Sequence, residues 1–294
     1  MEHRQYRAPT SLREAVTLVS ASAGRALQFT GGADELARLS SRRTAADILL
    51  DMRRIDELQV LECDPAQGFT IGTAVPWCRL GRHPRVAAAY PCLAMVAAMI
   101  RSLPGRARAT VGSSLCTTPA TSDAIPLLVA LEATCALAGP EGHRTVPLER
   151  CYDANGRSLL GRGEILVSIA LPAPRPHSGA WFIPFYPGPE REVIVLRVAA
   201  ALALNPDHSR ILAARVALGA AEPAPLILDT IGAVLAGQAP STALLNTAAA
   251  LARVAAWPRD ASAHAAYRAH ITGLVTRQAL SIALSQARRT AAAA

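Results

Sequence analysis

Residues 26–36, Ala-Leu-Gln-Phe-Thr-Gly-Gly-Ala-Asp-Glu-Leu, decide how the start of this chain folds. The run 26–29 favours a short strand, Thr30-Gly31-Gly32 a tight turn, and 33–40 a helix. A glycine turn between a strand and a helix leaves backbone N–H groups free and lets a phosphate approach closely. An ordinary tight turn has the same pattern, and the spacing matches neither G-x-G-x-x-G nor the P-loop.

The residues on both sides extend this stretch into a small α/β unit over about 1–55. Upstream, Ser11 can cap a helix, and Glu14, three residues on, completes a capping box. Downstream, a second short strand is predicted at 48–50. The predicted helix has one apolar face, which consists of Leu12, Ala15, Leu18 and Val19.

Beyond residue 59 short apolar strands alternate with apolar helices, and no internal repeat is visible. Strands at 60–63 and 69–72 are expected to pair around the turn Asp64-Pro65. After them we expect, in order, a helix over 91–101, a loop over 110–122, a helix over 124–133, and strands over 134–138 and 164–171.

The segment 171–179 is the best candidate for a linker, because its three prolines favour an extended spacer. Behind it we expect three strands, at 180–185, 193–204 and 211–218. Three Ala-rich helices are then expected, near 224–236, 241–256 and 262–289. Strands followed by helices indicate an α+β domain.

A second candidate binding segment is the hydroxyl-rich loop over 109–126. Its small side chains would expose backbone donors, and Asp123 could accept hydrogen bonds from ligand hydroxyls. The alternative for Asp123 is a helix N-cap, a position that aspartate favours in any protein. The loop alone does not decide between these two interpretations.

Composition excludes several classes of protein. The chain has 294 residues, 51% of them hydrophobic, which excludes disorder, and no stretch reaches the roughly 20 apolar residues of a membrane span. The net charge is +8, but the basic residues, all Arg, are scattered, and aromatic residues make up only 4%. Nucleic-acid binding is therefore not expected. A basic face that docks an acidic partner subunit fits the charge equally well.

Catalytic and metal-binding motifs are not found. The serines lie outside any G-x-S-x-G elbow, the seven histidines form no H-E-x-x-H motif, and the six cysteines form no C-x-x-C pair. The cysteines are expected to be free thiols of a cytoplasmic protein, because the first residues lack an apolar signal segment. Periplasmic export on a partner's signal stays open.

Taken together and in order, these segments resemble the flavin-binding medium subunits of the molybdenum hydroxylases, the group that includes carbon monoxide dehydrogenase, xanthine dehydrogenase and aldehyde oxidoreductases. No single piece is specific, but the collinear set, which covers nearly the whole chain, is. The similar pieces are Tyr6–Ala15, Gly31-Gly32-x-Asp34, Thr110-x-Gly112, Thr118-Pro119, Asp123, Glu164–Ile169 with Leu171-Pro172, Val198–Leu204, Val216–Gly219, Pro223–Leu226, Ala266–Arg268 and Arg277-x-Ala279-Leu280.

The resemblance implies an α+β fold. A PCMH-type FAD-binding α/β domain would span 1–172, with subdomains of about 1–55 and 56–172. A C-terminal domain of a three-stranded sheet and a helix bundle, like that of the CO dehydrogenase flavoproteins, would span 178–289.

The resemblance also implies a role in electron transfer. Electrons would leave a substrate at the molybdenum cofactor of a large partner chain and pass through [2Fe–2S] clusters of a small partner chain. They would reach FAD in this chain and then an external acceptor, so that the chain alone would turn over no substrate. No catalytic residue and no metal ligand is carried over.

The cofactor-binding residues follow from the same resemblance. The first pyrophosphate turn would be Thr30, Gly31, Gly32, Ala33 and Asp34, and the second would include Thr110, Gly112, Ser113 and Ser114. Asp123 would hold the polyol chain of the flavin, and Ile165 and Leu166 would pack near its ring system.

Four residues depart from the family pattern. Ser113 and Ser114 stand where the second turn has Gly-Asn, Ala33 where the first turn has a donor side chain, and Pro184 where Lys is frequent. A serine in place of glycine obstructs close backbone approach. These departures motivate a second hypothesis, a subunit that keeps the family fold but has a degenerate flavin site and serves as a scaffold between the molybdenum and iron–sulfur subunits.

Overall fold

The computed structural model describes residues 5–31, 46–99, 108–116, 122–187, 196–256 and 264–289. The chain forms two compact units. The first unit comprises 1–117, 132–153 and 157–173, and the second comprises 118–131, 154–156 and 174–294. The segment 118–131 thus groups with the second unit, although the domain boundaries expected from the sequence place it in the first. The predicted helix over 33–40 lies outside the described residues.

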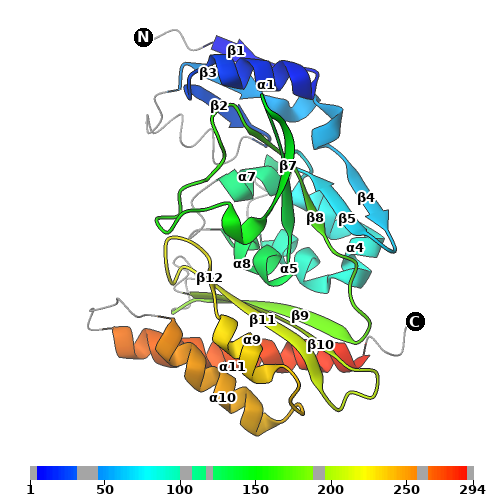
Figure 1. Ribbon diagram of the computed structural model, residues 1–294, viewed down its shortest axis with the longest axis vertical. Helices are drawn as coiled ribbons and strands as arrows, with labels where there is room; N and C mark the ends of the chain where they lie inside the picture. Colours follow the sequence, from blue (N-terminus) through cyan, green and yellow to red (C-terminus); the bar gives the residue numbers. More distant parts are fainter. Residues whose placement is uncertain are drawn as a thin grey trace. The chain divides into compact units, whose positions relative to one another are not determined.

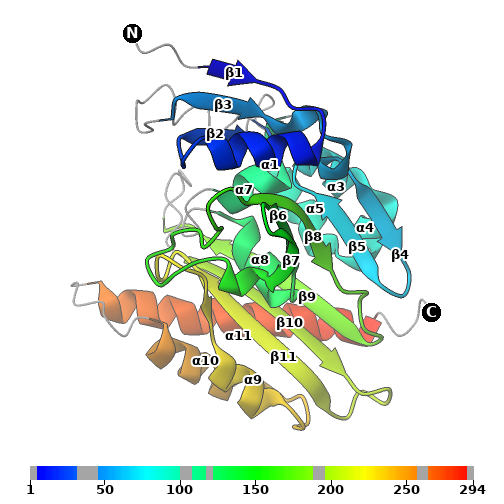
Figure 2. The ribbon, with the colours of Figure 1, turned by 45° about the horizontal axis from the view of Figure 1, so that its top comes forward.

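The first unit begins with the predicted small α/β unit. Its sheet has the order β1-β3-β2, with all neighbours parallel. The helix α1 lies beside these strands (Figure 2), and the side chain of Ser11 accepts a hydrogen bond from the Glu14 N–H, as the capping box predicts. Ala15 and Val19 pack against Leu50 and Ile165 in one buried cluster. The elements are β1 (Gln5–Arg7), α1 (Leu12–Ala21), β2 (Ala26–Phe29) and β3 (Ile48–Asp51).

The rest of the first unit is an antiparallel five-stranded sheet of order β4-β5-β8-β6-β7 with short helices (Figure 1). The strands are β4 (Leu61–Asp64), β5 (Gly68–Gly72), β6 (Thr134–Gly139), β7 (Gly142–Pro147) and β8 (Ile165–Leu171). The helices are α3 (Trp77–Arg82), α4 (Pro84–Ala89), α5 (Pro91–Met99) and α7 (Val111–Cys116), with 3₁₀ turns at Met52–Arg54, Asp56–Leu58 and Leu148–Arg150.

Two features of this unit differ from the sequence analysis. The predicted loop over 110–122 contains the helix α7, because Thr110 and Ser113 form a reciprocal cap: the Ser113 N–H donates to the Thr110 hydroxyl, and the Thr110 N–H donates to Ser113 Oγ. The strand β7 was not predicted, since most of its residues are exposed and show no alternation. It forms through pairing with β6 across a short turn.

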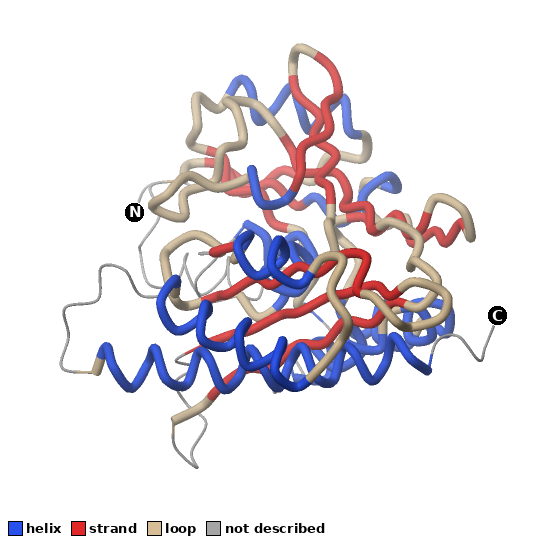
Figure 3. Tube along the Cα trace, turned by 60° about the horizontal axis from the view of Figure 1, so that its bottom comes forward, coloured by secondary structure: helices blue, strands red, loops and turns tan. Residues whose placement is uncertain are grey.

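The second unit is an antiparallel sheet of order β12-β11-β10-β9 with a layer of three helices on one face (Figure 1 and Figure 3). The predicted helix near 224–236 begins only at Asp229, because the short edge strand β12 precedes it. The elements are α8 (Ala124–Ala130), β9 (Ser178–Phe185), β10 (Leu196–Leu204), β11 (Ile211–Gly219), β12 (Leu226–Ile227), α9 (Asp229–Leu235), α10 (Thr242–Ala255) and α11 (Ala265–Arg289).

The core of the second unit follows from strand alternation. Leu196, Val198, Ala200 and the other even-numbered residues of β10 face the helix layer and pack against α9, α10 and α11. The odd-numbered residues face away from it. Their face carries α8, which packs on β10 and β11. The second unit therefore has the α+β architecture that the sequence predicts, with α8 as an additional helix on the opposite face.

Candidate functional site

The structure brings the two predicted pyrophosphate turns together in the first unit. Thr30 Oγ1 and Thr110 Oγ1 lie 2.8 Å apart and share a hydrogen bond. A Cβ atom on Gly31 would collide with the carbonyl oxygen of Arg108, and one on Gly112 would lie 2.6 Å from Thr73 Cβ. The two glycines are therefore needed for close packing of the protein against itself. Gly32, Ala33 and Asp34 lie outside the described residues.

Thr73, which the sequence analysis did not single out, joins two of the predicted site residues, Gly112 and Leu166. Its carbonyl accepts the N–H of Gly112 at 2.9 Å, and its hydroxyl donates to the Leu166 carbonyl at 3.0 Å. A chain of hydrogen bonds thus runs from β8 through Thr73 to the second turn, and through Thr110 to Thr30 at the end of β2. A lone threonine after a strand carries no sequence signal that would have revealed this role.

The backbone N–H groups of the second turn already donate hydrogen bonds within the protein. The N–H groups of Val111 and Gly112 donate to the carbonyls of Val75 and Thr73, and the Ser113 and Ser114 N–H groups donate to Thr110. The prediction that this loop exposes backbone donors is therefore wrong for these residues. The donors that remain here are side-chain hydroxyl groups.

The two serines of the second turn point back into the chain. The buried Ser113 hydroxyl donates to the Thr110 carbonyl at 2.9 Å. The Ser114 hydroxyl accepts a hydrogen bond from Trp77 Nε1 at 2.9 Å and contacts the Thr110 carbonyl at 3.3 Å. Both serines thus brace the turn through the carbonyl of Thr110.

Hydroxyl chemistry makes the junction of the two turns suitable for a phosphate. Each threonine hydroxyl carries one proton, and the bond between Thr30 and Thr110 uses one of the two. When Thr110 donates to Thr30, the Thr30 proton is left for a third group. Thr30 is partly exposed, whereas Thr110 is buried. The residues present therefore fit the pyrophosphate of FAD by the chemistry of their donors.

A charged network fixes the end of β2 directly before Thr30. Asp51, which pairs with Phe29 in the parallel register, accepts hydrogen bonds from the Tyr6 hydroxyl at 2.7 Å and from Arg53 at 2.8 and 2.9 Å. The Arg53 guanidinium lies over the Phe29 ring, 4.9 Å from its centroid. Burial raises the pKa of Asp51, but the hydrogen bonds from Arg53 and Tyr6 outweigh it and lower this pKa to about 2.

The other predicted site residues are distributed over both units. In the first unit, Ile165 and Leu166 are buried on β8, where Ile165 belongs to the cluster around α1. In the second unit, Asp123 precedes α8 but does not cap it, because its side chain makes no cap hydrogen bond. Its Oδ1 instead accepts a hydrogen bond from Arg197 Nε at 2.6 Å.

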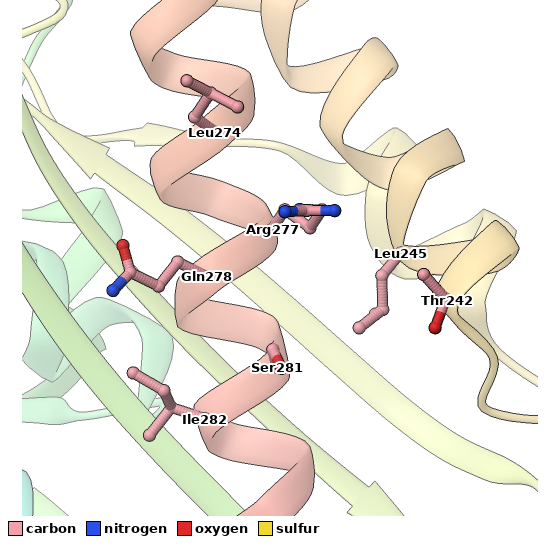
Figure 4. Close-up of a pocket in the computed structure, with 7 residues that line it drawn as sticks. All are labelled: Thr242, Leu245, Leu274, Arg277, Gln278, Ser281 and Ile282. Carbon is pink, nitrogen blue, oxygen red and sulfur yellow. The ribbon is translucent and has the colours of Figure 1, made fainter.

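A pocket of about 520 Å³ lies in the helix layer of the second unit, and none of the predicted site residues lines it. Figure 4 shows that two neighbouring helices form it, with Thr242 and Leu245 on α10 and the other residues on α11. Arg277, on its wall, donates to Asn246 Oδ1 at 3.2 Å. The pocket is lined by Thr242, Leu245, Leu274, Arg277, Gln278, Ser281 and Ile282.

Within the ranges of the chain that the structure describes, no three His, Cys, Asp or Glu side chains gather in a group that could hold a metal ion. No helix in the same ranges combines the length and the apolar character needed to cross a membrane.

The chain is similar to medium chains of carbon monoxide dehydrogenase. It is 32% identical to that of Hydrogenophaga pseudoflava over 169 residues, which are 58% of either chain. It is 26% identical to that of Afipia carboxidovorans over 285 residues, or 96% of this chain and 97% of the relative. The crystal structure of quinoline 2-oxidoreductase from Pseudomonas putida 86 aligns with a TM-score of 0.85 at 27% identity, covering 97% of this chain and 98% of that one.

Two family models account for most of the sequence. The FAD binding domain in molybdopterin dehydrogenase matches residues 2–174, and the CO dehydrogenase flavoprotein C-terminal domain matches residues 192–283. The first model covers more than half of the chain, and the predicted resemblance is confirmed. This chain therefore belongs to the family of FAD-binding medium subunits of the molybdenum hydroxylases, which are oxidoreductase flavoprotein subunits.

Proposed function

We propose that this chain carries electrons from [2Fe–2S] clusters of a small partner chain, through FAD, to an external acceptor. The clusters would receive these electrons from a large partner chain that holds the molybdenum cofactor. FAD supplies the redox chemistry when it is bound, and this chain supplies its position and surroundings. We expect no substrate turnover by the chain alone. A cytoplasmic location is proposed as well, since Cys63, Cys78 and Cys92 are thiols outside any disulfide.

One observation carries the proposal: the hydroxyl pair of Thr30 and Thr110 joins the two predicted turns and, when Thr110 donates, leaves the Thr30 proton for a third group. In this proposal the two turns hold the pyrophosphate, with Gly32, Ala33 and Asp34 completing the first and Ser113 and Ser114 bracing the second. Asp123 binds the polyol chain, and Ile165 and Leu166 pack near the ring system.

The scaffold hypothesis rests on four departures from the family pattern: Ala33, Pro184 and the two serines of the second turn, Ser113 and Ser114. Because the serine hydroxyl groups face the backbone of Thr110, their presence does not favour a degenerate site. Pro184 pairs with Arg197 in the sheet of the second unit, and Ala33 lies outside the described residues, so electron transfer remains the single proposed function.

The test is the visible absorption spectrum of the natively purified complex, followed by acid extraction and chromatography of its flavin. We expect about one FAD per copy of this chain, together with a large molybdenum-containing chain and a small iron-containing chain. Iron–sulfur absorption without extractable flavin, unchanged after FAD is added, would overturn the proposal. If the chain purifies from its native host without either partner, it does not receive electrons from partner chains, and that part of the proposal is contradicted.

A further inference from the structure

The helix α8 is held on the sheet of the second unit by two arginines, one at each end. Arg197 Nε donates to Asp123 Oδ1 at 2.6 Å, directly before the helix. Arg215 Nε donates to the carbonyl oxygen of Val129, in the last turn of the helix, at 3.1 Å. Both arginines come from strands, Arg197 from β10 and Arg215 from β11.

The register of the sheet explains why α8 fits between these arginines. Arg197 pairs with Gly219, and Ala199 pairs with Ala217, so the surface between the two arginines consists of small residues. A Cβ atom on Gly219 would lie 2.5 Å from Pro126 Cγ of α8. The helix therefore rests directly on the strands, and its position relative to Arg197 is fixed.

The ion pair between Arg197 and Asp123 is asymmetric in its exposure. The Arg197 side chain is only 7% exposed, whereas that of Asp123 is 31% exposed. A buried guanidinium requires a partner, because desolvating an unpaired charge is costly. The hydrogen bond uses Asp123 Oδ1, and it leaves Oδ2 able to accept from a ligand.

The residue before Asp123 supplies an independent observation. The Ser122 hydroxyl oxygen is buried and has no hydrogen-bond partner among the residues that the structure describes. Ser122 itself is 7% exposed. Leaving a buried hydroxyl group unpaired is destabilising, and such groups in folded proteins call for an explanation. A ligand hydroxyl group would pair with it, either by donating to Ser122 Oγ or by accepting its proton.

We propose that Arg197 is a positioning residue for the polyol chain of the flavin. It fixes the Asp123 carboxylate on the sheet, and Asp123 Oδ2 and the Ser122 hydroxyl together recognise the hydroxyl groups of the ribityl chain. A carboxylate acceptor beside a hydroxyl that donates and accepts suits a polyol, whose hydroxyl groups do both. This inference rests on the proposed function, since it takes FAD as the ligand.

The test compares FAD dissociation constants of the deflavinated full-length chain by fluorescence titration. Arg197→Met, which removes the charge but keeps the bulk, is expected to raise the constant about tenfold. Arg197→Lys should restore part of the affinity. Asp123→Asn should weaken binding similarly. Adding Arg197→Met to Asp123→Asn should have little further effect, because both substitutions remove the same interaction between Arg197 and Asp123.

Arg215→Met is the matched control, because it loosens the other end of the same helix. We expect it to lower the melting temperature but to leave the FAD dissociation constant within about twofold of the wild type. If Arg215→Met weakens FAD binding as much as Arg197→Met does, Arg197 acts only through the placement of α8, and the inference is overturned. An unchanged FAD affinity in Arg197→Met would overturn it as well.

Ser122→Ala keeps the inference testable should Arg197→Met not fold. Removing an unpaired buried hydroxyl group should leave the melting temperature unchanged or raise it, while FAD binds about threefold more weakly. Tighter or equal FAD binding in Ser122→Ala would contradict a role in polyol recognition.

Adenosine diphosphate, used as a competitor, separates this inference from the proposed function, because it has the pyrophosphate but no ribityl chain. Its affinity should be the same in the wild type and in Arg197→Met. A wild-type chain that binds neither FAD nor adenosine diphosphate would refute the proposed function itself. FAD binding that is insensitive to Arg197→Met and Ser122→Ala would refute this inference alone.

Discussion

The second turn and Asp123, both expected at the flavin, are held in place by opposite means. Thr110 and Ser113 bind one another over three positions of sequence, through hydroxyl groups and backbone at 2.9 to 3.2 Å. Asp123 is held by Arg197, which lies 74 positions further along the chain. The first arrangement is complete within one turn, whereas the second exists only once the sheet of the second unit has formed.

Because of this difference, the second turn and Asp123 depend on different parts of the chain for their positions. A locally capped turn keeps its shape as long as its own residues are intact. A carboxylate fixed by a distant strand depends on the register of that strand and on the small residues that let α8 approach it. Changes far from Asp123 in sequence should therefore alter its position, and changes far from Thr110 should matter only where they touch the turn directly.

The most damaging substitution should be at a long-range contact next to the second turn, because that turn is also packed and hydrogen-bonded against distant segments. Gly31→Ala would drive a methyl group into the Arg108 carbonyl, which lies next to the second turn. We expect a loss of roughly 3 kcal/mol in the free energy of unfolding, measured by urea denaturation, and a loss of measurable FAD binding.

Gly24→Ala is the control for this change. Gly24 has a φ of +84° and open space around its Cβ position, so only backbone strain is added. That strain should cost roughly 1 kcal/mol. Equal losses in the free energy of unfolding would mean that the close contact of Gly31 with Arg108 does not add to the cost of the substitution.

Asp51 combines a local partner, Arg53, with a distant one, Tyr6, and the pH dependence of stability reports on both. Its folded pKa of about 2 lies below the ordinary value of 3.8. The ionised form is therefore favoured by folding, and this contribution is present above pH 4 and lost as the pH falls from about 4 to 2. We expect a loss of about 2 kcal/mol across this window, measured by urea denaturation at each pH.

Asp51→Asn should remove most of this pH dependence. Tyr6→Phe, which removes the partner 45 positions away, should reduce it less than Arg53→Met, which removes the partner two positions away. The reverse order would show that the distant hydrogen bond dominates.

The same contrast explains how much the sequence could predict. The capping box of Ser11 and Glu14, the strand Ala26–Phe29 and the apolar run of β10 are local patterns, and they predicted these elements correctly. The T-x-x-S pattern at Thr110–Ser113 was also local, but it was hidden in a hydroxyl-rich loop. Thr73 and Arg197 could not be found, because their partners lie far along the chain and no single sequence records which strands will pair.

Arg215→Met should have a smaller effect than the loss of Asp51. It would remove the hydrogen bond to the Val129 carbonyl, a group in a helix turn whose residues are all buried. We expect a loss of roughly 1 to 2 kcal/mol in the free energy of unfolding, measured by urea denaturation. Arg210→Met is the matched control, because Arg210 donates to the carbonyl of Gly237 at an exposed position. Equal losses in the free energy of unfolding would mean that the hydrogen bond from Arg215 to α8 is not strengthened by burial.

Ser113→Ala should have the smallest effect on stability and isolates the local half of the comparison. It removes the hydroxyl group that accepts the Thr110 N–H and donates to the Thr110 carbonyl. We expect a loss of about 1 kcal/mol in the free energy of unfolding, measured by urea denaturation. Ser11→Ala, which removes the exposed cap of α1, should cost about as much. Only Ser113→Ala should also weaken FAD binding, since only that cap shapes a proposed pyrophosphate turn. Tighter FAD binding in Ser113→Ala or Ser113→Gly would instead mean that the serine obstructs the cofactor, and it would return weight to a degenerate site.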